Sequence, residues 1–208
     1  MNNQNQQAGG GRINMAAFLP KSRVNGPGLR AVVWVQGCHR CCPGCFNEDM
    51  QAFRENQPVS AKKLADRILA LDGIEGVTFS GGEPFAQAAL LADLADILSG
   101  QGLNIAVFTG YTYQELLAGQ DDAWNRLLAA ADLLIAGPFK RELPSTEYLL
   151  GSANQELIFL TDTLKGHPDT LGRTEQLLEI TVDKDGNVTT TGLGGGDIIK
   201  QTNLQAGF

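Results

Sequence analysis

All four cysteines of this 208-residue chain lie in one short stretch, residues Gly37–Asn47. Three thiolates on one loop can bind three irons of a 4Fe-4S cluster and leave the fourth iron open to a substrate or cofactor. Two sets of three fit this description. Cys38, Cys42 and Cys45 have the spacing Cys-x3-Cys-x2-Cys, whereas taking Cys41 in place of Cys42 gives Cys-x2-Cys-x3-Cys. We favour the first set, in which Cys41 is a spare thiol.

Other uses of clustered cysteines fit the sequence less well. A structural zinc site usually needs a second Cys or His pair elsewhere, and the only histidine outside the stretch is His167. Disulfides between residues this close would be strained, and the sequence shows no secretory signal. The spacing therefore favours an iron–sulfur site over zinc, and free thiols indicate a reducing, cytoplasmic compartment.

Length and composition predict one globular domain. Hydrophobic residues make up 43% of the chain and charged residues 19%, as in soluble proteins, and no apolar run approaches the ~18–20 residues of a membrane span. The net charge of −7 argues against a nucleic-acid partner, because a phosphate backbone attracts basic surfaces. Residues 1–12 are rich in Asn, Gln and Gly and are expected to form a disordered lead.

Short apolar runs alternate with amphipathic stretches along most of the chain. The expected strands are Ala31–Val35, Gly76–Ser80, Asn104–Thr109, Leu133–Ala136 and Leu157–Leu160, with a further short strand within residues 13–28. The expected helices are Ala61–Leu71, Phe85–Ser99, a short one around Leu116, and Trp124–Ala131. Such alternation predicts a parallel sheet of βαβ units, with too few units for a closed eight-stranded barrel. We therefore predict an α/β fold built as an open, partial parallel βα barrel.

The last part of the chain follows a different pattern. Leu178–Val182 and Val188–Thr190 flank the turn sequence Asp183–Asn187, which predicts a β-hairpin. Gly194–Gly196 is expected to be a flexible link, because no strand, lysine and helix surround it as in a phosphate-binding loop. The predicted organisation is a lead over residues 1–12, a core over residues 13–161 and a small β appendage over residues 162–208.

A second motif, Ser80–Pro84 (Ser-Gly-Gly-Glu-Pro), follows a predicted strand. Its glycines allow a ligand to approach the backbone closely, and Glu83 could meet a ligand ammonium group. The simpler interpretation of this motif alone is a turn that opens a helix. Because the carboxyl ends of parallel strands meet at one edge of a sheet, we expect this turn to lie beside the cysteine loop. Together the two motifs indicate a binding site more strongly than the turn does alone.

Several segments together resemble a known family. Cys-x3-Cys-x2-Cys with a downstream Gly-Gly-Glu-Pro is similar to the radical S-adenosylmethionine superfamily. Five segments, in the same order, resemble those of anaerobic ribonucleotide reductase activating enzymes: Asn25–Gly28, Cys42–Asn47, Ser80–Pro84, Thr109–Tyr111 and Gly151–Gln155. The resemblance covers about residues 13–161 and leaves the last part of the chain outside it.

The resemblance implies two cofactors, a 4Fe-4S cluster and S-adenosylmethionine. It assigns Cys38, Cys42 and Cys45 to the cluster, with the methionine amine and carboxylate on the open iron. It assigns cofactor binding to six further residues: Gly44, Phe46, Asn47, Gly81, Gly82 and Glu83. It implies no acid–base catalytic residue.

The resemblance also implies a reaction and its partners. One electron from the cluster, delivered by an external donor such as flavodoxin, cleaves S-adenosylmethionine to a 5′-deoxyadenosyl radical. The radical then removes a hydrogen atom from a backbone glycine of a large glycyl-radical enzyme. Two alternatives remain open, namely a radical enzyme that acts on a peptide or small metabolite, and a metal-binding module without turnover.

Four other residues have two interpretations each. His39 and Arg40 could tune the cluster, but we favour solvated loop residues. Asn154 and Gln155 could contact a partner or close a turn, and the sequence does not decide between these roles.

Overall fold

The computed structural model describes residues 11–170, 175–182, 186 and 188–193. Most of the predicted lead, most of the Asp183–Asn187 turn and the Gly194–Gly196 link lie outside these described residues.

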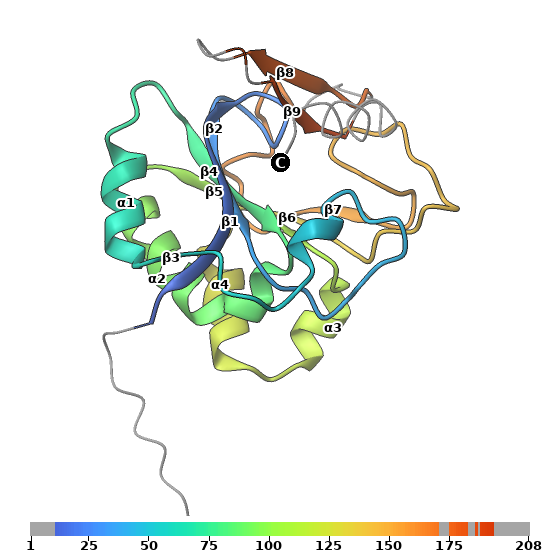
Figure 1. The fold of residues 1–208 in the computed structure, drawn as a ribbon, viewed down its shortest axis with the longest axis horizontal. Helices are drawn as coiled ribbons and strands as arrows, with labels where there is room; N and C mark the ends of the chain where they lie inside the picture. Colours follow the sequence, from blue (N-terminus) through green and yellow to red (C-terminus); the bar gives the residue numbers. More distant parts are fainter. Residues whose placement is uncertain (1–10, 171–174, 183–185, 187, 194–208) are drawn as a thin grey trace, which may run out of the picture.

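A seven-stranded mixed sheet forms the centre of the fold (Figure 1), in the order β3-β1-β2-β4-β5-β6-β7. The strands are β1 (Ile13–Ser22), β2 (Arg30–Val35), β3 (Gln57–Val59), β4 (Gly76–Gly81), β5 (Asn104–Thr109), β6 (Leu133–Ala136) and β7 (Glu156–Phe159). The central four, β2, β4, β5 and β6, are parallel. Their mostly apolar residues are largely buried on both faces, as is usual for parallel strands.

Helices cover one face of this sheet (Figure 1). They are α1 (Ala61–Leu69), α2 (Ala88–Ser99), α3 (Tyr113–Ala118) and α4 (Asp122–Ala130), with short 3₁₀ helices η1 (Glu48–Met50) and η2 (Pro84–Gln87). Helix α2 packs against both α1 and α4, and Leu94, Leu98 and Leu127 join Phe79 of the sheet in the main core. In the part of the chain that the structure describes, no helix has both the length and the apolar character needed to cross a lipid bilayer.

The four predicted βαβ strands are confirmed, and the flanking strands correct the prediction of an all-parallel sheet. Strand β7 is antiparallel to β6, because the intervening residues 137–155 contain no helix that could return the chain to the opposite edge. The strand expected within residues 13–28 is the ten-residue β1, which is antiparallel to β2. Strand β3, which was not predicted, extends the same edge.

A second, smaller core lies on the face of the sheet opposite the helices. Leu149, Leu150 and Leu164 pack there against strand residues that include Ala106 and Ile135. This packing draws the first residues of the C-terminal extension onto the sheet.

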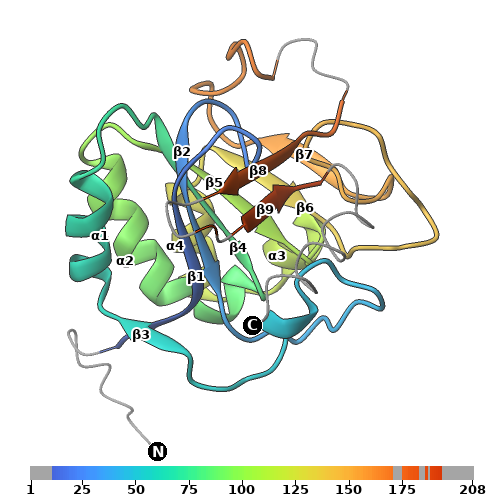
Figure 2. The same ribbon diagram turned by 45° about the horizontal axis from the view of Figure 1, so that its top comes forward.

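The predicted hairpin is present as β8 (Leu178–Val182) paired antiparallel with β9 (Val188–Gly192). It lies beside the turn between β1 and β2 (Figure 2), where the Ser22 hydroxyl donates to Glu179 Oε2 (2.7 Å) and Asn25 Nδ2 donates to Thr191 Oγ1 (2.9 Å).

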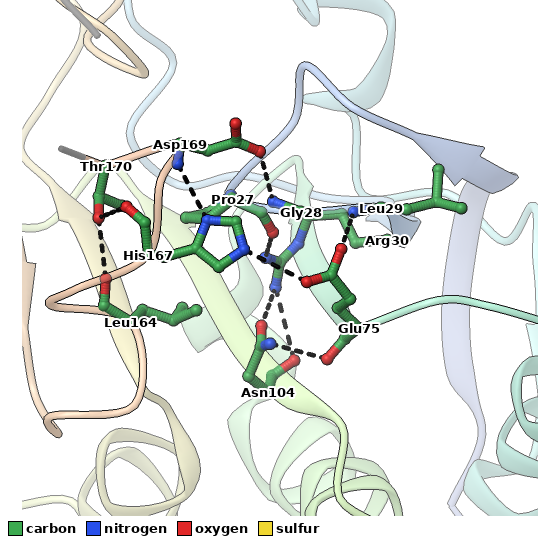
Figure 3. A network of polar contacts seen from close by, with 10 residues as sticks. All are labelled: Pro27, Gly28, Leu29, Arg30, Glu75, Asn104, Leu164, His167, Asp169 and Thr170. Carbon is green, nitrogen blue, oxygen red and sulfur yellow. Dashed lines mark hydrogen bonds and ion pairs between the residues drawn. The ribbon is translucent and has the colours of Figure 1, made fainter. Parts of the chain in front are cut away.

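A polar network also joins the extension to the amino-terminal ends of the parallel strands (Figure 3). Glu75 accepts from the Leu29 amide (2.9 Å) and contacts His167 Nε2 (3.2 Å), and Asp169 Oδ2 accepts from the Gly28 amide (2.9 Å). Beneath these contacts the fully buried Arg30 donates to main-chain carbonyls, including that of Val77 (3.0 Å), and burial lowers its pKa to about 10. These contacts of the extension are therefore made at the edge opposite the one where the cysteine loop begins.

Candidate cluster and cofactor site

Four loops meet at the carboxyl edge of the parallel strands. The cysteine loop follows β2, the Gly-Gly-Glu-Pro turn follows β4, Gly110–Thr112 follows β5, and residues 137–142 follow β6. Parallel strands place their carboxyl ends at one edge, where α/β proteins bind their ligands. The structure therefore brings together the two motifs that the sequence singled out.

Main-chain hydrogen bonds hold both ends of the cysteine loop. The Gly37 amide donates to Met50 O (2.8 Å), and the Cys38 amide donates to Gln51 O (2.9 Å). Further along, Asn47 Nδ2 donates to Gly81 O (3.3 Å), which ties this loop to the turn after β4. Asn47 thus links the two motifs directly.

The four cysteines differ in exposure. Cys38 is buried, Cys42 and Cys45 are half-buried, and Cys41 is exposed. The Cys41 thiol donates to Cys38 O (3.3 Å). The backbone of Cys41 is in the left-handed region (φ 45°), which residues other than glycine rarely adopt. The Cys45 sulfur accepts from the Asn47 amide (3.4 Å), the kind of N–H···S contact that tunes cluster potentials.

Burial raises the pKa of Cys38 and of Cys45, and neighbouring acidic groups raise both further. Each thiol therefore prefers its protonated form until a metal centre supplies positive charge. Among the described residues, no three His, Cys, Asp or Glu side chains are arranged to hold a single metal ion. In a cluster each thiolate binds a different iron, so three thiols on one loop fit the donor chemistry of such a group.

The glycines of the second motif serve a contact between loops. A Cβ on Gly82 would collide with the carbonyl of Gly37 and lie 2.8 Å from Met50 O, and a Cβ on Gly81 would lie 2.5 Å from Val35 N. The Gly82 and Glu83 amides donate to Val35 O (2.7 Å) and Gly37 O (2.8 Å). The absence of side chains thus lets the turn lie directly on the base of the cysteine loop.

Glu83 is fully buried and both of its carboxylate oxygens accept hydrogen bonds. Oε1 accepts from the Phe85 amide (3.0 Å) and the Thr109 hydroxyl (2.8 Å), and Oε2 accepts from the Gly110 amide (2.8 Å). Burial raises the pKa of Glu83 to about 7, although these donors oppose the shift. The side chain therefore joins the ends of β4 and β5 from inside the protein.

A hollow of about 680 Å³ lies between the cysteine loop and the loop after β6. Its lining comes from both loops: Arg40, Cys42, Pro43, Gly44, Pro138, Phe139, Lys140, Arg141 and Glu142. Gly44 has a left-handed backbone (φ 71°), and a Cβ there would lie 3.1 Å from Arg141 Cδ. Cys42 and Gly44 therefore both line this hollow.

The loop after β6 is held by the predicted Gly151–Gln155 segment. Gln155 Nε2 donates to Gly137 O (2.9 Å), and Asn154 Nδ2 donates to Pro138 O (2.8 Å). Phe46 packs on Phe139 of this loop with ring centroids 4.8 Å apart. In the structure Asn154 and Gln155 thus fix a wall of the hollow.

Sequence reasoning missed the roles of Arg40 and its neighbours. Arg40 pairs with Glu115 (3.1 Å) and lies over the Tyr111 ring (5.0 Å), rather than projecting into solvent. His39 stacks on Phe53 at 4.3 Å. The Thr109–Tyr111 segment was the sequence feature that indicated this part of the site. Nothing in that segment indicated that Tyr111 would contact Arg40 of the cysteine loop.

Comparisons with known proteins show the family of this chain. A family model described as "4Fe-4S single cluster domain" matches residues 24–158. The chain is similar to the anaerobic ribonucleoside-triphosphate reductase-activating protein of Salmonella typhi, with 32% identity over 152 residues, covering 66% of this chain and 93% of that protein. The protein of that name from Vibrio cholerae is 34% identical over 153 residues, with coverages of 69% and 96%.

Two further similarities are more limited. The pyruvate formate-lyase-activating enzyme of Clostridium pasteurianum is 36% identical over 107 residues, covering 47% of this chain and 45% of that enzyme. The crystal structure of QueE from Escherichia coli covers 49% of this chain and 53% of that one, with a TM-score of 0.36 and 19% identity. A structural similarity this low supports no argument.

Proposed function

Because this chain belongs to the 4Fe-4S single cluster domain family and to the anaerobic ribonucleoside-triphosphate reductase-activating proteins, we propose that it generates a glycyl radical on a large partner enzyme of the ribonucleotide reductase class. It is a radical S-adenosylmethionine enzyme with a 4Fe-4S cluster. When bound, the cluster and S-adenosylmethionine supply the chemistry, which is reductive cleavage of a sulfonium C–S bond to a 5′-deoxyadenosyl radical.

The chain itself supplies the ligands, and we assign these to Cys38, Cys42 and Cys45. Cys42 supports this set because it lines the hollow, whereas Cys41 is exposed and its thiol donates to Cys38 O. The half-buried Cys45, with its sulfur hydrogen-bonded to Asn47, would complete the set.

Cofactor binding is assigned to the surrounding turns. Gly81, Gly82 and Glu83 would hold the methionine end through main-chain groups, since the Glu83 carboxylate is already bound by three donors. On the other side, Gly44, Phe46 and Asn47 would contact the cofactor. Phe46 would pack near it from its place beside Phe139. The observation that carries this proposal is that the cysteine loop and the Gly81–Glu83 turn contact each other at one edge of the sheet.

We expect residues 13–161 to form an open, partial βα barrel and residues 162–208 to form an extension, which packs on the sheet through described residues such as Leu164. The electron would come from an external donor such as flavodoxin. A net charge of −7 disfavours nucleic acid as a partner, and free thiols favour a cytoplasmic location.

Anaerobic reconstitution tests the function. We expect about four irons and four sulfides per chain, and 5′-deoxyadenosine when S-adenosylmethionine and dithionite are added. Addition of the large reductase should then give a glycyl-radical EPR signal and oxygen-dependent cleavage of that partner. Zinc in place of iron would overturn the enzyme assignment, whereas cofactor cleavage without a radical on the reductase would overturn only the choice of partner.

A further inference from the structure

Arg40 reaches from the middle of the cysteine loop to the segment that follows β5. Its Nη1 lies 3.1 Å from Glu115 Oε1, and its guanidinium carbon lies 5.0 Å from the centre of the Tyr111 ring. The side chain is only 25% exposed. Two favourable interactions, an ion pair and a cation–π contact, therefore converge on one cation.

Gly110 lies between Arg40 and the buried Glu83. A Cβ on Gly110 would lie 2.8 Å from Arg40 Cγ and 3.4 Å from Glu83 Oε2. The Gly110 amide also donates to Glu83 Oε2 (2.8 Å). Three strand-end segments, those after β2, β4 and β5, consequently meet at a position where a side chain on Gly110 would force Arg40 to shift.

Glu115, the carboxylate of this ion pair, is also held by residues of its own helix end. Glu115 Oε2 accepts from the Thr112 amide (2.7 Å) and hydroxyl (3.1 Å), as part of a capping box at the start of α3. The Thr112 amide and then Arg40 lower the pKa of Glu115. An ionised, oriented carboxylate therefore faces the guanidinium.

The middle of the cysteine loop has few other ties to the sheet. Its ends are bound through Gly37 and Cys38. Apart from the bond of Arg40, the described hydrogen bonds of residues 39–44 are made within the loop, such as Cys45 N to Cys42 O (3.2 Å), or with Gln51 Nε2, which donates to Cys42 O (3.5 Å). Within the described part of the chain, Arg40 thus makes the polar contact that joins this segment to another strand end.

We propose that Arg40 is a positioning residue for the cluster: it fixes the cysteine loop relative to the Gly81–Glu83 turn by binding Glu115 and Tyr111. This inference rests on the proposed function, because its consequence is the relative placement of the cluster thiolates and the cofactor. The cluster and the Gly81–Glu83 turn would hold the same cofactor, so a loop tied only at its ends would have to be ordered when S-adenosylmethionine binds, and that ordering weakens binding.

Five proteins test the proposal: the wild type, Arg40→Ala, Arg40→Lys, Glu115→Gln and the double variant Arg40→Ala/Glu115→Gln. Gln at 115 can still accept from Thr112 and so preserves the helix cap. Arg126→Ala is the matched control, because Arg126 also pairs with carboxylates, Asp93 and Asp96 (both 2.9 Å), but joins α4 to α2. Each protein is reconstituted anaerobically before measurement.

The first measurement is amide hydrogen exchange in peptides that cover residues 38–46. We expect faster exchange in Arg40→Ala, near wild-type exchange in Arg40→Lys, and no change in Arg126→Ala. The second measurement is the steady-state rate of 5′-deoxyadenosine formation against cofactor concentration. Arg40→Ala should raise KM for S-adenosylmethionine about tenfold with kcat changed less than about threefold, a size typical of losing an ion pair and a cation–π contact.

The double variant and the control show whether Arg40 acts on the loop through Glu115 or only affects the protein as a whole. If the two side chains act through each other, the double variant should be no worse than Arg40→Ala. Equal loop exchange and equal KM in Arg40→Ala and Arg126→Ala would overturn the proposal, as would exchange that rises uniformly over the whole chain. A wild-type protein that fails to cleave S-adenosylmethionine would overturn the proposed function instead, and the exchange comparison would still decide whether Arg40 holds the loop.

Discussion

At the scale of single residues, Glu83 shows how burial sets chemistry. Its folded-state pKa of about 7 lies above the ordinary value of 4.5. The folded protein therefore binds the Glu83 proton more tightly than the unfolded chain does. This preference contributes fully to the free energy of unfolding below pH about 4.5, and the contribution is lost as the pH rises through about 7. The difference corresponds to about 3 kcal/mol.

Glu83→Gln should remove this pH dependence. The amide cannot titrate, so we expect the free energy of unfolding of the apoprotein to change less between pH 5 and 8 than in the wild type. The variant should also lose about 1–3 kcal/mol at acidic pH, because its NH₂ group would face the Gly110 amide. Urea unfolding at a series of pH values measures both effects, and parallel pH profiles for the two proteins would contradict the prediction.

Cys41 and Cys42 allow a second test at the residue scale. Cys42→Ala should abolish the cluster absorbance and cofactor cleavage, because Cys42 lines the hollow. Cys41→Ala should retain both, because Cys41 is exposed. The reverse pattern would select the Cys-x2-Cys-x3-Cys set.

At the scale of elements, the contact between the turn after β4 and the cysteine loop is the tightest part of the site. Gly82→Ala should lower the free energy of unfolding by about 1–3 kcal/mol, because the added methyl group meets main-chain atoms of Gly37 and Met50 that cannot rotate away. Iron content after reconstitution should fall as well.

Gly166→Ala is the control for this substitution, since nothing lies within 4 Å of its Cβ position. We expect a change within about 0.5 kcal/mol there. If both variants unfold at the same denaturant concentration, the close approach of the two loops is not a constraint on stability.

At the scale of the whole molecule, the described polar contacts of His167 with Glu75 and of Asp169 with Gly28 are made at the edge of the sheet opposite the site. Leu164→Ala should lower the free energy of unfolding by about 2–4 kcal/mol, since Leu164 is buried in the second core. KM for S-adenosylmethionine should stay at the wild-type value, because contacts of the extension such as His167 with Glu75 (Figure 3) are made at the amino-terminal ends of the parallel strands.

Leu117→Ala provides the comparison, because Leu117 is 55% exposed and its truncation should have little effect on stability. A rise of KM in Leu164→Ala, measured at a temperature where the variant is folded, would mean that the extension shapes the cofactor site. That result would support the alternative of a different substrate.

The sequence predicted what depends on neighbours along the chain. The strands β2, β4, β5 and β6 have short apolar sequences bounded by turn residues, so their positions followed from local pattern. The reversal of β7 did not follow, because an isolated strand sequence carries no direction. At the site, the cysteine spacing and the turn around Glu83 were local signals as well.

The tertiary structure alone decided how these local pieces meet. Arg40 and Glu115 are separated by 75 positions, and nothing in either residue's neighbours marks the other as its partner. The sequence likewise placed Glu83 beside a ligand, whereas burial under the ends of β4 and β5 gives its carboxylate three internal donors. Chemistry that lies in one short segment can be read from the residues, but side-chain partners and pKa values depend on which distant segments the sheet brings within hydrogen-bonding distance.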